Sequence, residues 1–411
     1  AGTVAVIGAA AMVAMLLIAT GAELTERAGL RIEAIKYGLG FFAAAGAAAA
    51  LLLGVRRQRL SERSHQLELR KQTHTETDAV ERRVTELYTK AVEQLGSADA
   101  AVRLGGLYAL ERVAQNNPDQ RQTVVNVLCA YLRMPYALPN AGVAAEAAGG
   151  RDPRQELEVR LTAQKVVSSH LAPTDATGNT QAFWPDIDLN LAGATLIDWR
   201  FAGRLVRNAQ FKGATFSGAA RFEAATFAGP AGFNGAVFTG GAQFDRASFR
   251  RDARFGRAEF GGFASLRQAV FEGRAEFSEA VFGGEVWFED AVFEGHPQFG
   301  DAEFRGDAWF DGARFTAGVT FGGAAFSGQA RFDRAMIQGA ARFDGARFAG
   351  DVRFERATFA GAAQFNNVTF ARPPALEEAV VDARDDDGDV WPPGWRLVST
   401  GGTGRLTHSA G

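Results

Sequence analysis

The sequence predicts a β-solenoid that follows a series of helical segments, and three observations support this prediction. Phenylalanine recurs over residues 211–370 at alternating steps of five and six, with only Leu266 and Ile337 as exceptions. A small residue, usually Ala, lies two positions before each of these residues. Two long apolar stretches and several amphipathic stretches come first, within residues 4–172. Since a strict internal period is typical of stacked repeats, the period of residues 211–370 determines the predicted architecture.

Two apolar stretches, residues 4–20 and 38–55, begin the sequence. Each is close to the ~20 residues that a bilayer-spanning helix needs. We therefore predict a transmembrane hairpin over residues 1–55, with helices at 4–20 and 38–55. A secretory signal is the alternative for the first stretch, although a basic start is missing.

Basic residues predict the orientation of this hairpin. Three of them, Arg27, Arg31 and Lys36, lie between the two apolar stretches. More follow the second stretch: Arg56, Arg57, Arg59, Arg63, Arg70 and Lys71. Because cytoplasmic flanks carry an excess of Lys and Arg, we expect the chain to be anchored in the cell membrane, with everything after residue 56 in the cytoplasm.

Residues 56–172 have the patterns of helices. Residues 56–79 are strongly charged and predict a helical stalk, whereas residues 80–172 carry apolar side chains at helical spacing and predict an α-helical module. Residues 134–153, rich in Pro, Gly and Ala, predict a flexible insertion in that module. Gly105 and Gly106 predict close helix packing, and we interpret Arg103 and Glu111 as surface residues. Residues 173–190 are predicted to be a linker into the solenoid.

The period of eleven could also indicate a helical supercoil, but two arguments oppose it. On a helix, positions five residues apart lie about 140° apart, so the phenylalanines would not form one seam. The intervening glycines would each cost roughly 1 kcal/mol in a helix. On short strands, the Ala at i−2 and the Phe at i point to the same side. The predicted solenoid covers residues 191–372, and its core includes Phe211, Phe222, Phe244, Phe288, Phe310, Phe332 and Phe354.

The residues between the phenylalanines indicate a coil of about 22 residues. The residue after Phe222, and each residue 22 positions further on, is charged, whereas the residues at the intermediate positions are mostly small or neutral. Two alternating chemistries imply two different faces. Leu191, Leu196, Phe201 and Val206 step by five and are expected to form the first coil. Residues 373–411 are predicted to be a C-terminal cap followed, beyond Ser399, by a disordered tail.

This spacing resembles that of the pentapeptide-repeat family. The resemblance implies a right-handed quadrilateral β-helix in which the central residue and the small residue at i−2 point inward. This sequence differs from uniform five-residue steps by an additional residue at every second corner. Residues 88–96, 102–112 and 183–189 further resemble a module that precedes the repeats in membrane-anchored members from actinobacteria. The resemblance to these members implies no biochemical activity.

No pattern in the sequence predicts chemistry. The five histidines are scattered, and no spacing among them suggests a metal site or a general base. Cys129 is the only cysteine and lies among apolar residues, so we expect a small core residue in a reducing compartment. We predict no catalytic residue, no cofactor, no metal and no enzymatic activity.

One exterior column of the predicted solenoid is the candidate interaction face. At 22-residue spacing it contains Arg221, Gln243, Ser265, Trp287, Trp309, Arg331 and Arg353. Trp287 and Trp309 are expected to stack one rung apart and exposed, with Arg331 against the second ring. An acidic column lies beside them, formed by Glu289, Asp311 and Asp333. An exposed aromatic pair rimmed by charge is typical of a binding site.

A structural alternative explains the same column without a partner. In it, Arg331–Asp333 and Arg353–Glu355 neutralise each other, and the tryptophans pack under the insertion at 134–153. The sequence leaves this choice open.

The leading functional hypothesis is a non-enzymatic, membrane-tethered scaffold that binds an unknown protein partner and could form a homo-oligomer. A gyrase-binding DNA mimic is the second, implied by resemblance to the quinolone-resistance branch of the family. Mimicry of DNA needs strong continuous negative charge, whereas residues 209–372 contain 18 basic and 19 acidic residues. The formal net charge of −3 also argues against a nucleic-acid partner. A third hypothesis makes the helical module a sensor or effector and the solenoid a spacer.

Overall fold

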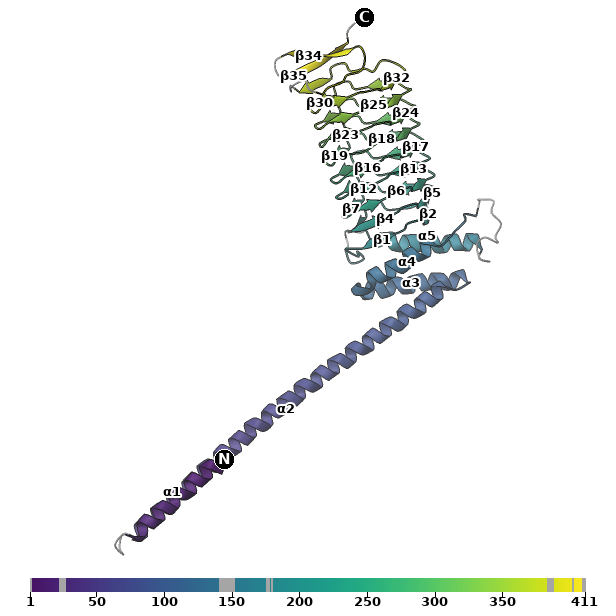
Figure 1. Cartoon of the computed structure of the whole chain (residues 1–411). Coiled ribbons are helices and arrows are strands. Elements are labelled where there is room, and N and C mark those ends of the chain that lie inside the picture. The colour runs from purple at the N-terminus through teal and green to yellow at the C-terminus, as the bar shows by residue number, and fades with distance from the viewer. Residues whose placement is uncertain are drawn as a thin grey trace. The chain divides into compact units, whose positions relative to one another are not determined.

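The computed structural model describes residues 2–21, 27–139, 152–174, 178, 180–382, 388–400 and 403–408. The chain divides into two units, Ala1–Thr85 and Glu86–Gly411. Figure 1 shows the helices of the first unit and, in the second, shorter helices followed by a stack of short strands.

The first unit contains α1 (Gly2–Thr20) and most of α2 (Arg27–Leu95). The two helices pack closely through glycine, because a Cβ atom on Gly8 would lie 2.3 Å from the ring of Phe41 and one on Gly38 would lie 2.6 Å from Met12 Sδ. One described segment, Arg31–Arg59, is long and apolar enough to cross a membrane, with a mean hydropathy of 2.0. The apolar segment of α1, Val6–Ile18, is shorter. The second predicted span thus has a counterpart in the structure, and the first stays a prediction.

The second unit begins with a helical module formed by the end of α2, α3 (Ala100–Asn116), the 3-10 helix η1 (Pro118–Gln120), α4 (Arg121–Arg133) and α5 (Pro153–Ser169). Aspartates cap two of these helices: Asp99 accepts from Ala101 N at 2.8 Å, and Asp152 accepts from Arg154 N at 2.9 Å. A Cβ atom on Gly106 would lie 2.8 Å from Ala91 O, so the close packing predicted at this glycine is present.

A charged network lies in the core of this module. Arg103 is only 1% exposed, so its interpretation as a surface residue is wrong. Glu156 binds Arg103 at 3.2 Å and Arg160 at 3.0 Å, and it accepts a hydrogen bond from Tyr131 Oη at 2.8 Å. The guanidinium groups also donate to backbone carbonyls, such as Ser97 O from Arg103. Helix packing buries these charges, which pair with one another, and Arg103 Nε alone in this network is buried without a hydrogen-bond partner among the described residues.

Glu111, the other residue interpreted as a surface residue, is half-buried and joins α3 to the C-terminal end of α5. It lies 2.7 Å from Nε2 of His170, whose Nδ1 lies 2.7 Å from Ala182 O. The His170 ring stacks on Trp184 at 3.9 Å. Trp184 is fully buried, so the segment predicted as a linker (173–190) contributes to the core at its end.

The solenoid consists of short parallel strands on four faces, which we call faces A to D. Face A contains β1 (Asp188–Asn190), β4 (Asn208–Gln210), β8 (Ala231–Gly232), β12 (Ala253–Arg254), β16 (Ala275–Glu276), β23 (Val319–Thr320), β27 (Ala341–Arg342) and β31 (Ala363–Gln364). Face B contains β2 (Thr195–Ile197), β5 (Thr215–Ser217), β9 (Val237–Phe238), β13 (Glu259–Phe260), β17 (Val281–Phe282), β20 (Glu303–Phe304), β24 (Ala325–Phe326), β28 (Arg347–Phe348) and β32 (Thr369–Phe370).

The other two faces complete each coil. Face C contains β6 (Ala220–Arg221), β10 (Ala242–Gln243), β14 (Ala264–Ser265), β18 (Val286–Trp287), β21 (Ala308–Trp309), β25 (Ala330–Arg331) and β29 (Val352–Arg353). Face D contains β3 (Leu205–Val206), β7 (Thr226–Phe227), β11 (Ser248–Phe249), β15 (Val270–Phe271), β19 (Val292–Phe293), β22 (Arg314–Phe315), β26 (Met336–Ile337), β30 (Thr358–Phe359), β33 (Val380–Asp382), β35 (Thr403–His408) and β34 (Trp395–Thr400).

The strand register confirms the predicted coil of about 22 residues. Phe249 pairs with Phe271, and Trp287 pairs with Trp309. The first coil is shorter, since Leu196 pairs with Phe216. All seven phenylalanines of the predicted core are fully buried and lie in stacked columns. Phe288 and Phe332, for example, lie 4.9 and 4.8 Å from Phe310, with nearly parallel rings.

The corners of the coil are of two kinds. After faces A and C, the residue two positions beyond the buried residue has a positive φ, as in Asp290 (54°) and Gly312 (66°). After faces B and D, the coil contains an additional residue, and after face B glycine recurs every 22 residues over 218–350. A Cβ atom on Gly306 would lie 2.5 Å from the carbonyl carbon of Gly284 one rung away. The additional residue fits at this corner because glycine lets the backbones of adjacent rungs come into direct contact.

The two ends of the solenoid differ from the prediction. Its first strand, β1, begins at Asp188, within the segment predicted as a linker. At the other end, β33 pairs in parallel with β30, and β35 pairs with β33 and β34 in antiparallel fashion. Residues 403–408, predicted to be disordered, thus form a strand. Trp391 packs against Phe359 and Phe365 and covers the last rung of the core.

Candidate functional site

The predicted interaction column lies on face C, where consecutive strands place its side chains in register. Ser265 pairs with Trp287, Trp287 with Trp309, Trp309 with Arg331, and Arg331 with Arg353. Each of these residues directly precedes a buried Leu or Phe, so strand alternation turns it outward. We call this column, together with its neighbouring carboxylates and Arg267, the tryptophan ladder.

The two indoles of the ladder meet edge to face, with centroids 6.1 Å apart and planes at 75°. Both side chains are half-buried, so the expectation of an exposed pair is wrong. Side chains from the next rungs cover them, including Phe263, whose ring lies 5.6 Å from Trp287. Edge-to-face contact is favoured because the positive edge of one ring meets the negative face of the other.

Each indole also carries a guanidinium group. Arg331 Cζ lies 5.4 Å from the ring centroid of Trp309, as the column order predicted. Arg267 Cζ lies 4.7 Å from that of Trp287. Arg267 is not among the predicted site residues, although its position directly after buried Leu266, one rung before Trp287, could have indicated it. Both contacts are cation–π interactions between side chains of neighbouring rungs.

The carboxylates of the ladder alternate with its arginines. Asp311 and Asp333 are buried, at 5% and 7% exposed, whereas Glu289 is half-buried. The ion pairs are Arg267–Glu289 (2.6 Å), Arg331–Asp311 (2.9 Å), Arg331–Asp333 (3.8 Å), Arg353–Asp333 (3.0 Å) and Arg353–Glu355 (2.9 Å). Two of these pairs are those of the structural alternative. Packing under the predicted insertion cannot be assigned, because residues 140–151 lie outside the described residues.

Among the described residues, five polar atoms of the ladder between Ser265 and Glu355 are closed to solvent and have no hydrogen-bond partner: Trp287 Nε1, Trp309 Nε1, Arg331 Nε, Arg353 Nε and Asp311 Oδ2. Burial raises the pKa of Asp311, and the nearby Arg331 opposes this effect. Buried polar groups in native proteins are nearly always paired. The ion pairs of the ladder therefore leave some of its buried polar atoms without hydrogen bonds.

A notch lies beside the ladder at the corner between faces C and D. Its volume is about 390 Å³. The residues that line it include Arg246, Arg267, Glu289, Asp290, Asp311 and Arg334. It places buried Asp311 and exposed Asp290 at one opening of the surface.

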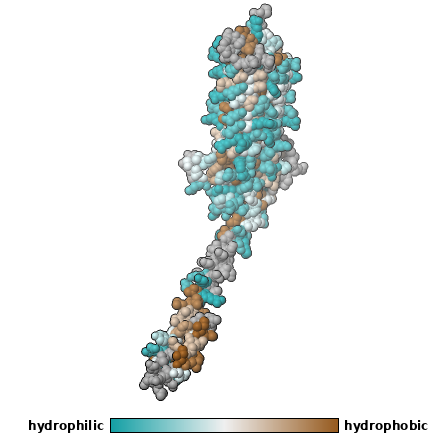
Figure 2. All heavy atoms as spheres, turned by 60° about the vertical axis from the view of Figure 1, so that its left-hand side comes forward, coloured by the Kyte–Doolittle hydropathy of each residue, from teal (hydrophilic) through white to brown (hydrophobic). Residues whose placement is uncertain are grey.

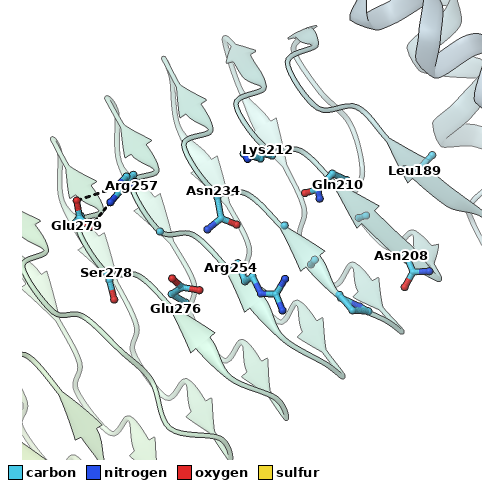
Figure 3. A pocket seen from close by; sticks show the side chains of 15 residues that line it. Leu189, Asn208, Gln210, Lys212, Asn234, Arg254, Arg257, Glu276, Ser278 and Glu279 are labelled. Atoms are coloured by element: carbon cyan, nitrogen blue, oxygen red, sulfur yellow. Dashed lines mark hydrogen bonds and ion pairs between the residues drawn. The ribbon is translucent and has the colours of Figure 1, made fainter.

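A larger groove of about 740 Å³ lies on face A (Figure 3). Glycines at 232 and 256 leave gaps in its side-chain columns, between residues such as Gln210, Asn234 and Glu276. Figure 3 shows these side chains extending from successive strands, with Arg257 and Glu279 paired at 2.9 Å. Among the described residues, none of the groove's side chains has a buried unpaired polar atom. The groove is thus a solvated polar surface, and the ladder is the stronger candidate site.

The described residues contain no group of three or more His, Cys, Asp and Glu side chains that could hold a metal ion. Burial raises the pKa of Cys129 to about 11, so little thiolate exists at neutral pH. Its position in the core of the helical module agrees with the sequence prediction.

Comparisons with known families identify the repeated segment. A family model described as "Pentapeptide repeats (9 copies)" matches residues 206–248, 233–281, 255–297, 277–325, 288–336, 321–369 and 332–379. These overlapping matches include both the ladder and most of the face A groove. Comparisons with curated proteins and with solved structures find no match.

Proposed function

Because the chain is a pentapeptide-repeat protein, with repeats over residues 206–379, we propose that it is a non-enzymatic scaffold tethered to a membrane and that its tryptophan ladder binds a protein partner. The observation that carries this proposal is the aromatic and cationic surface of the ladder, in which half-buried Trp287 and Trp309 meet edge to face and each contacts a guanidinium group.

The composition of the ladder suits a protein interface. Trp and Arg are the residue types that most often carry the binding energy of such interfaces. Exposed Phe263, at 39%, extends the aromatic surface next to Trp287. Stacked phenylalanines behind face C hold the strands in place, so little ordering of the backbone is needed when a partner binds.

The tether is proposed from the apolar part of α2. Arg31–Arg59 has only 6% of its apolar window buried, and Leu51, Leu52 and Leu53 are each about two-thirds or more exposed. Figure 2 shows exposed hydrophobic side chains in this unit. Exposed apolar helices need a lipid or protein environment. With α1 as the second span, the basic residues after residue 55 would face the cytoplasm.

The other hypotheses have less support. DNA mimicry needs free negative charge, whereas the carboxylates of the ladder are paired with arginines. The hypothesis that the solenoid is only a spacer for the helical module does not explain the ladder.

The test of the ladder is partner capture from native membranes with the full chain. Trp287→Ala combined with Trp309→Ala should lower partner recovery at least tenfold. The matched control, Gln298→Ala with Thr320→Ala, alters equivalent outward positions on face A and should leave recovery unchanged. Thermal melting of both double variants checks that the solenoid is intact. Unchanged recovery with the folded tryptophan variant would refute the docking role.

The test of the tether is membrane fractionation together with proximity labelling from the C-terminus. We expect the chain in the membrane fraction, resistant to carbonate extraction, with cytoplasmic neighbours labelled. Recovery in the soluble fraction, or labelling of external proteins, would contradict the proposed anchoring or its orientation.

A further inference from the structure

We infer that the chain binds the phosphate group of a phosphate monoester in a pocket between α5 and the first coil of the solenoid. The pocket has a volume of about 460 Å³, a size at which proteins bind small molecules. Lys165, Arg200 and Arg204 line it together with one acidic residue, Asp198, and we call it the cationic pocket. It shares no residue with the tryptophan ladder, so the inference does not depend on the proposed function.

Gln164 holds α5 against the first coil and thereby fixes the two walls of the cationic pocket. Its side-chain amide donates to Ile197 O at 2.7 Å and accepts from Ile197 N at 2.8 Å. Figure 1 shows α5 next to the first strands of the stack. Because these bonds join the helix to the backbone of β2, the pocket is formed without a ligand, and little ordering is needed on binding.

Arg204 is the central cation of the pocket and is half-buried. Its Nε donates to Ser168 O at 3.1 Å, and its Nη1 donates to Ala202 O, so two neutral carbonyls orient the guanidinium group. Its Nη2 has no hydrogen bond to a described residue and is not closed to solvent, so a ligand can reach it. Burial lowers the pKa of Arg204, and no carboxylate of the described residues opposes this effect. A bound anion would stabilise this charge.

Arg200 adds a second positive charge that lacks a carboxylate. It pairs with Arg221 of the adjacent rung, and both side chains are exposed and form no ion pair among the described residues. Like charges opposite each other on neighbouring strands are destabilising. Further along the same face, Arg331 and Arg353 have carboxylates at 2.9 and 3.0 Å. Glu223, at the equivalent position of the early rungs, forms no ion pair with a described arginine, so an anion in the pocket would relieve the repulsion.

The charges of the pocket suit a phosphate monoester better than an anion with a single charge. Exposed Lys165 supplies the third cation, and three cations against one carboxylate leave a net charge of +2. The carboxylate of Asp198 is already engaged, since its Oδ1 accepts from Ala219 N at 3.1 Å. A phosphate monoester carries about −1.5 to −2 charges at pH 7, and guanidinium forks bind its oxygens in pairs. Leu161 and Ile197 provide an apolar wall for the organic part of the ester.

Isothermal titration calorimetry on the full chain in non-ionic detergent tests the chemistry. The soluble probes are glycerol 3-phosphate and, as its neutral analogue, glycerol. The lipid probes are dihexanoyl phosphatidic acid, which is a phosphate monoester, and dihexanoyl phosphatidylcholine, which is a diester with the same acyl chains. Both monoesters should bind about tenfold or more tightly than their matched controls, because only they present the doubly charged group. Failure of both monoesters to exceed their controls would overturn the inference.

The same titrations distinguish the two sources of the phosphate group. Binding of dihexanoyl phosphatidic acid about tenfold tighter than glycerol 3-phosphate, beyond any effect of the phosphatidylcholine, would assign a lipid headgroup to the pocket. A smaller difference would assign a soluble phosphate monoester. Either result supports the shared chemistry.

Exposed cations inside and outside the pocket provide matched variants. Arg200→Gln should weaken binding of glycerol 3-phosphate about tenfold, and Lys165→Gln should weaken it several-fold, because each removes a charged donor. Arg250 and Lys212 are also exposed and without an ion pair among the described residues, but they lie outside the pocket. Arg250→Gln and Lys212→Gln should leave binding unchanged. Equal losses in all four variants would indicate non-specific attraction and refute a defined site.

Thermal melting separates a binding role of Arg200 from a structural one. Since Arg200→Gln removes the repulsion with Arg221, the ligand-free variant should melt no lower than the wild-type protein. Glycerol 3-phosphate should raise the melting temperature of the wild-type protein and not that of the variant. A ligand-free variant that melts lower would show that Arg200 stabilises the fold, and it would contradict the inference.

The variant of the ladder distinguishes the cationic pocket from the proposed docking face. Trp287→Ala with Trp309→Ala should bind glycerol 3-phosphate as the wild-type protein does, and Arg200→Gln should leave partner recovery unchanged. The inference would fail by itself if the monoesters do not bind while partner recovery still depends on the tryptophans. Loss of phosphate binding in the tryptophan variant would refute a separate pocket.

Discussion

The helical module and the solenoid stabilise their cores by different means. The module buries two arginines and a glutamate among the apolar faces of its helices. The solenoid core consists of Phe columns and small residues, and every rung presents nearly the same surface to the next. In the module the contacts are unique and far apart in the sequence, whereas in the solenoid each is a copy of its neighbour. One chain thus combines a core that depends on individual polar contacts with a core that depends on repetition.

The two kinds of core should tolerate substitutions differently. A buried ion pair adds little net stability over apolar packing, yet removal of one partner leaves an uncompensated charge. A repeat array, by contrast, distributes its stability over many similar interfaces. The module should therefore be sensitive at single positions, and the solenoid should respond according to how much volume or backbone clearance is lost.

The largest effect is expected from Glu156→Ala, because it leaves Arg103 and Arg160 buried without their carboxylate. Loss of one partner of a buried pair costs about 3–5 kcal/mol. Urea denaturation followed by far-ultraviolet circular dichroism should show the helical signal lost at lower urea, with the strand signal little changed. Exposed Glu158→Ala on the same helix is the control. Equal stability of the Glu156 and Glu158 variants would mean that the network is dispensable.

Phe310→Ala tests the solenoid core at its centre. The deletion removes a ring that contacts Phe288 and Phe332, and we expect a loss of about 3–5 kcal/mol in the free energy of unfolding. Phe310→Leu should cost less than about 1.5 kcal/mol, since Leu266 occupies the same column. Denaturant titration of the strand signal measures both. A leucine variant as unstable as the alanine variant would contradict repetition as the source of tolerance.

Gly306→Ala tests the corner rather than the core. The new Cβ atom would lie 2.5 Å from the carbonyl carbon of Gly284, so the rungs must separate, at a cost of about 1–3 kcal/mol. Gly300→Ala, whose Cβ atom would come no closer than 3.8 Å to Gly322 O, should have little effect. Thermal melting distinguishes them. Similar melting temperatures for the two variants would show that the corner accommodates a side chain.

The smallest effect is expected from the titration of Asp311. Its pKa is raised in the folded state, so the native protein binds this proton more tightly than the unfolded chain does. The free energy of unfolding should therefore increase as pH falls from neutral through the native pKa, and the gain should be complete below the unfolded value of 3.8. The difference between the wild-type protein and Asp311→Asn isolates this term. A difference that changes in the opposite direction would show that the pairing with Arg331 outweighs burial.

The period of the solenoid could be predicted from the sequence because it repeats a local rule. Alternation within a short strand determines which residues face inward, and the spacing of 22 determines which residues are neighbours on adjacent rungs. The identity of the Phe core and the order of the ladder, including Arg331 beside Trp309, follow from these two facts. The match of the repeated segment to a family model agrees with the same rule.

Features that depend on the direction of a side chain or on contacts between distant segments could be seen only in the tertiary structure. The sequence placed Trp287 and Trp309 one rung apart, but only the packing of Phe263 and Arg267 from neighbouring rungs made them half-buried and edge to face. The burial of Arg103 depends on Glu156, more than fifty residues away on another helix. No local pattern specifies such a pair, because the partner is selected by how helices pack. Repetition therefore made the solenoid predictable from the sequence, whereas the charged core of the module and the notch beside the ladder required the three-dimensional structure.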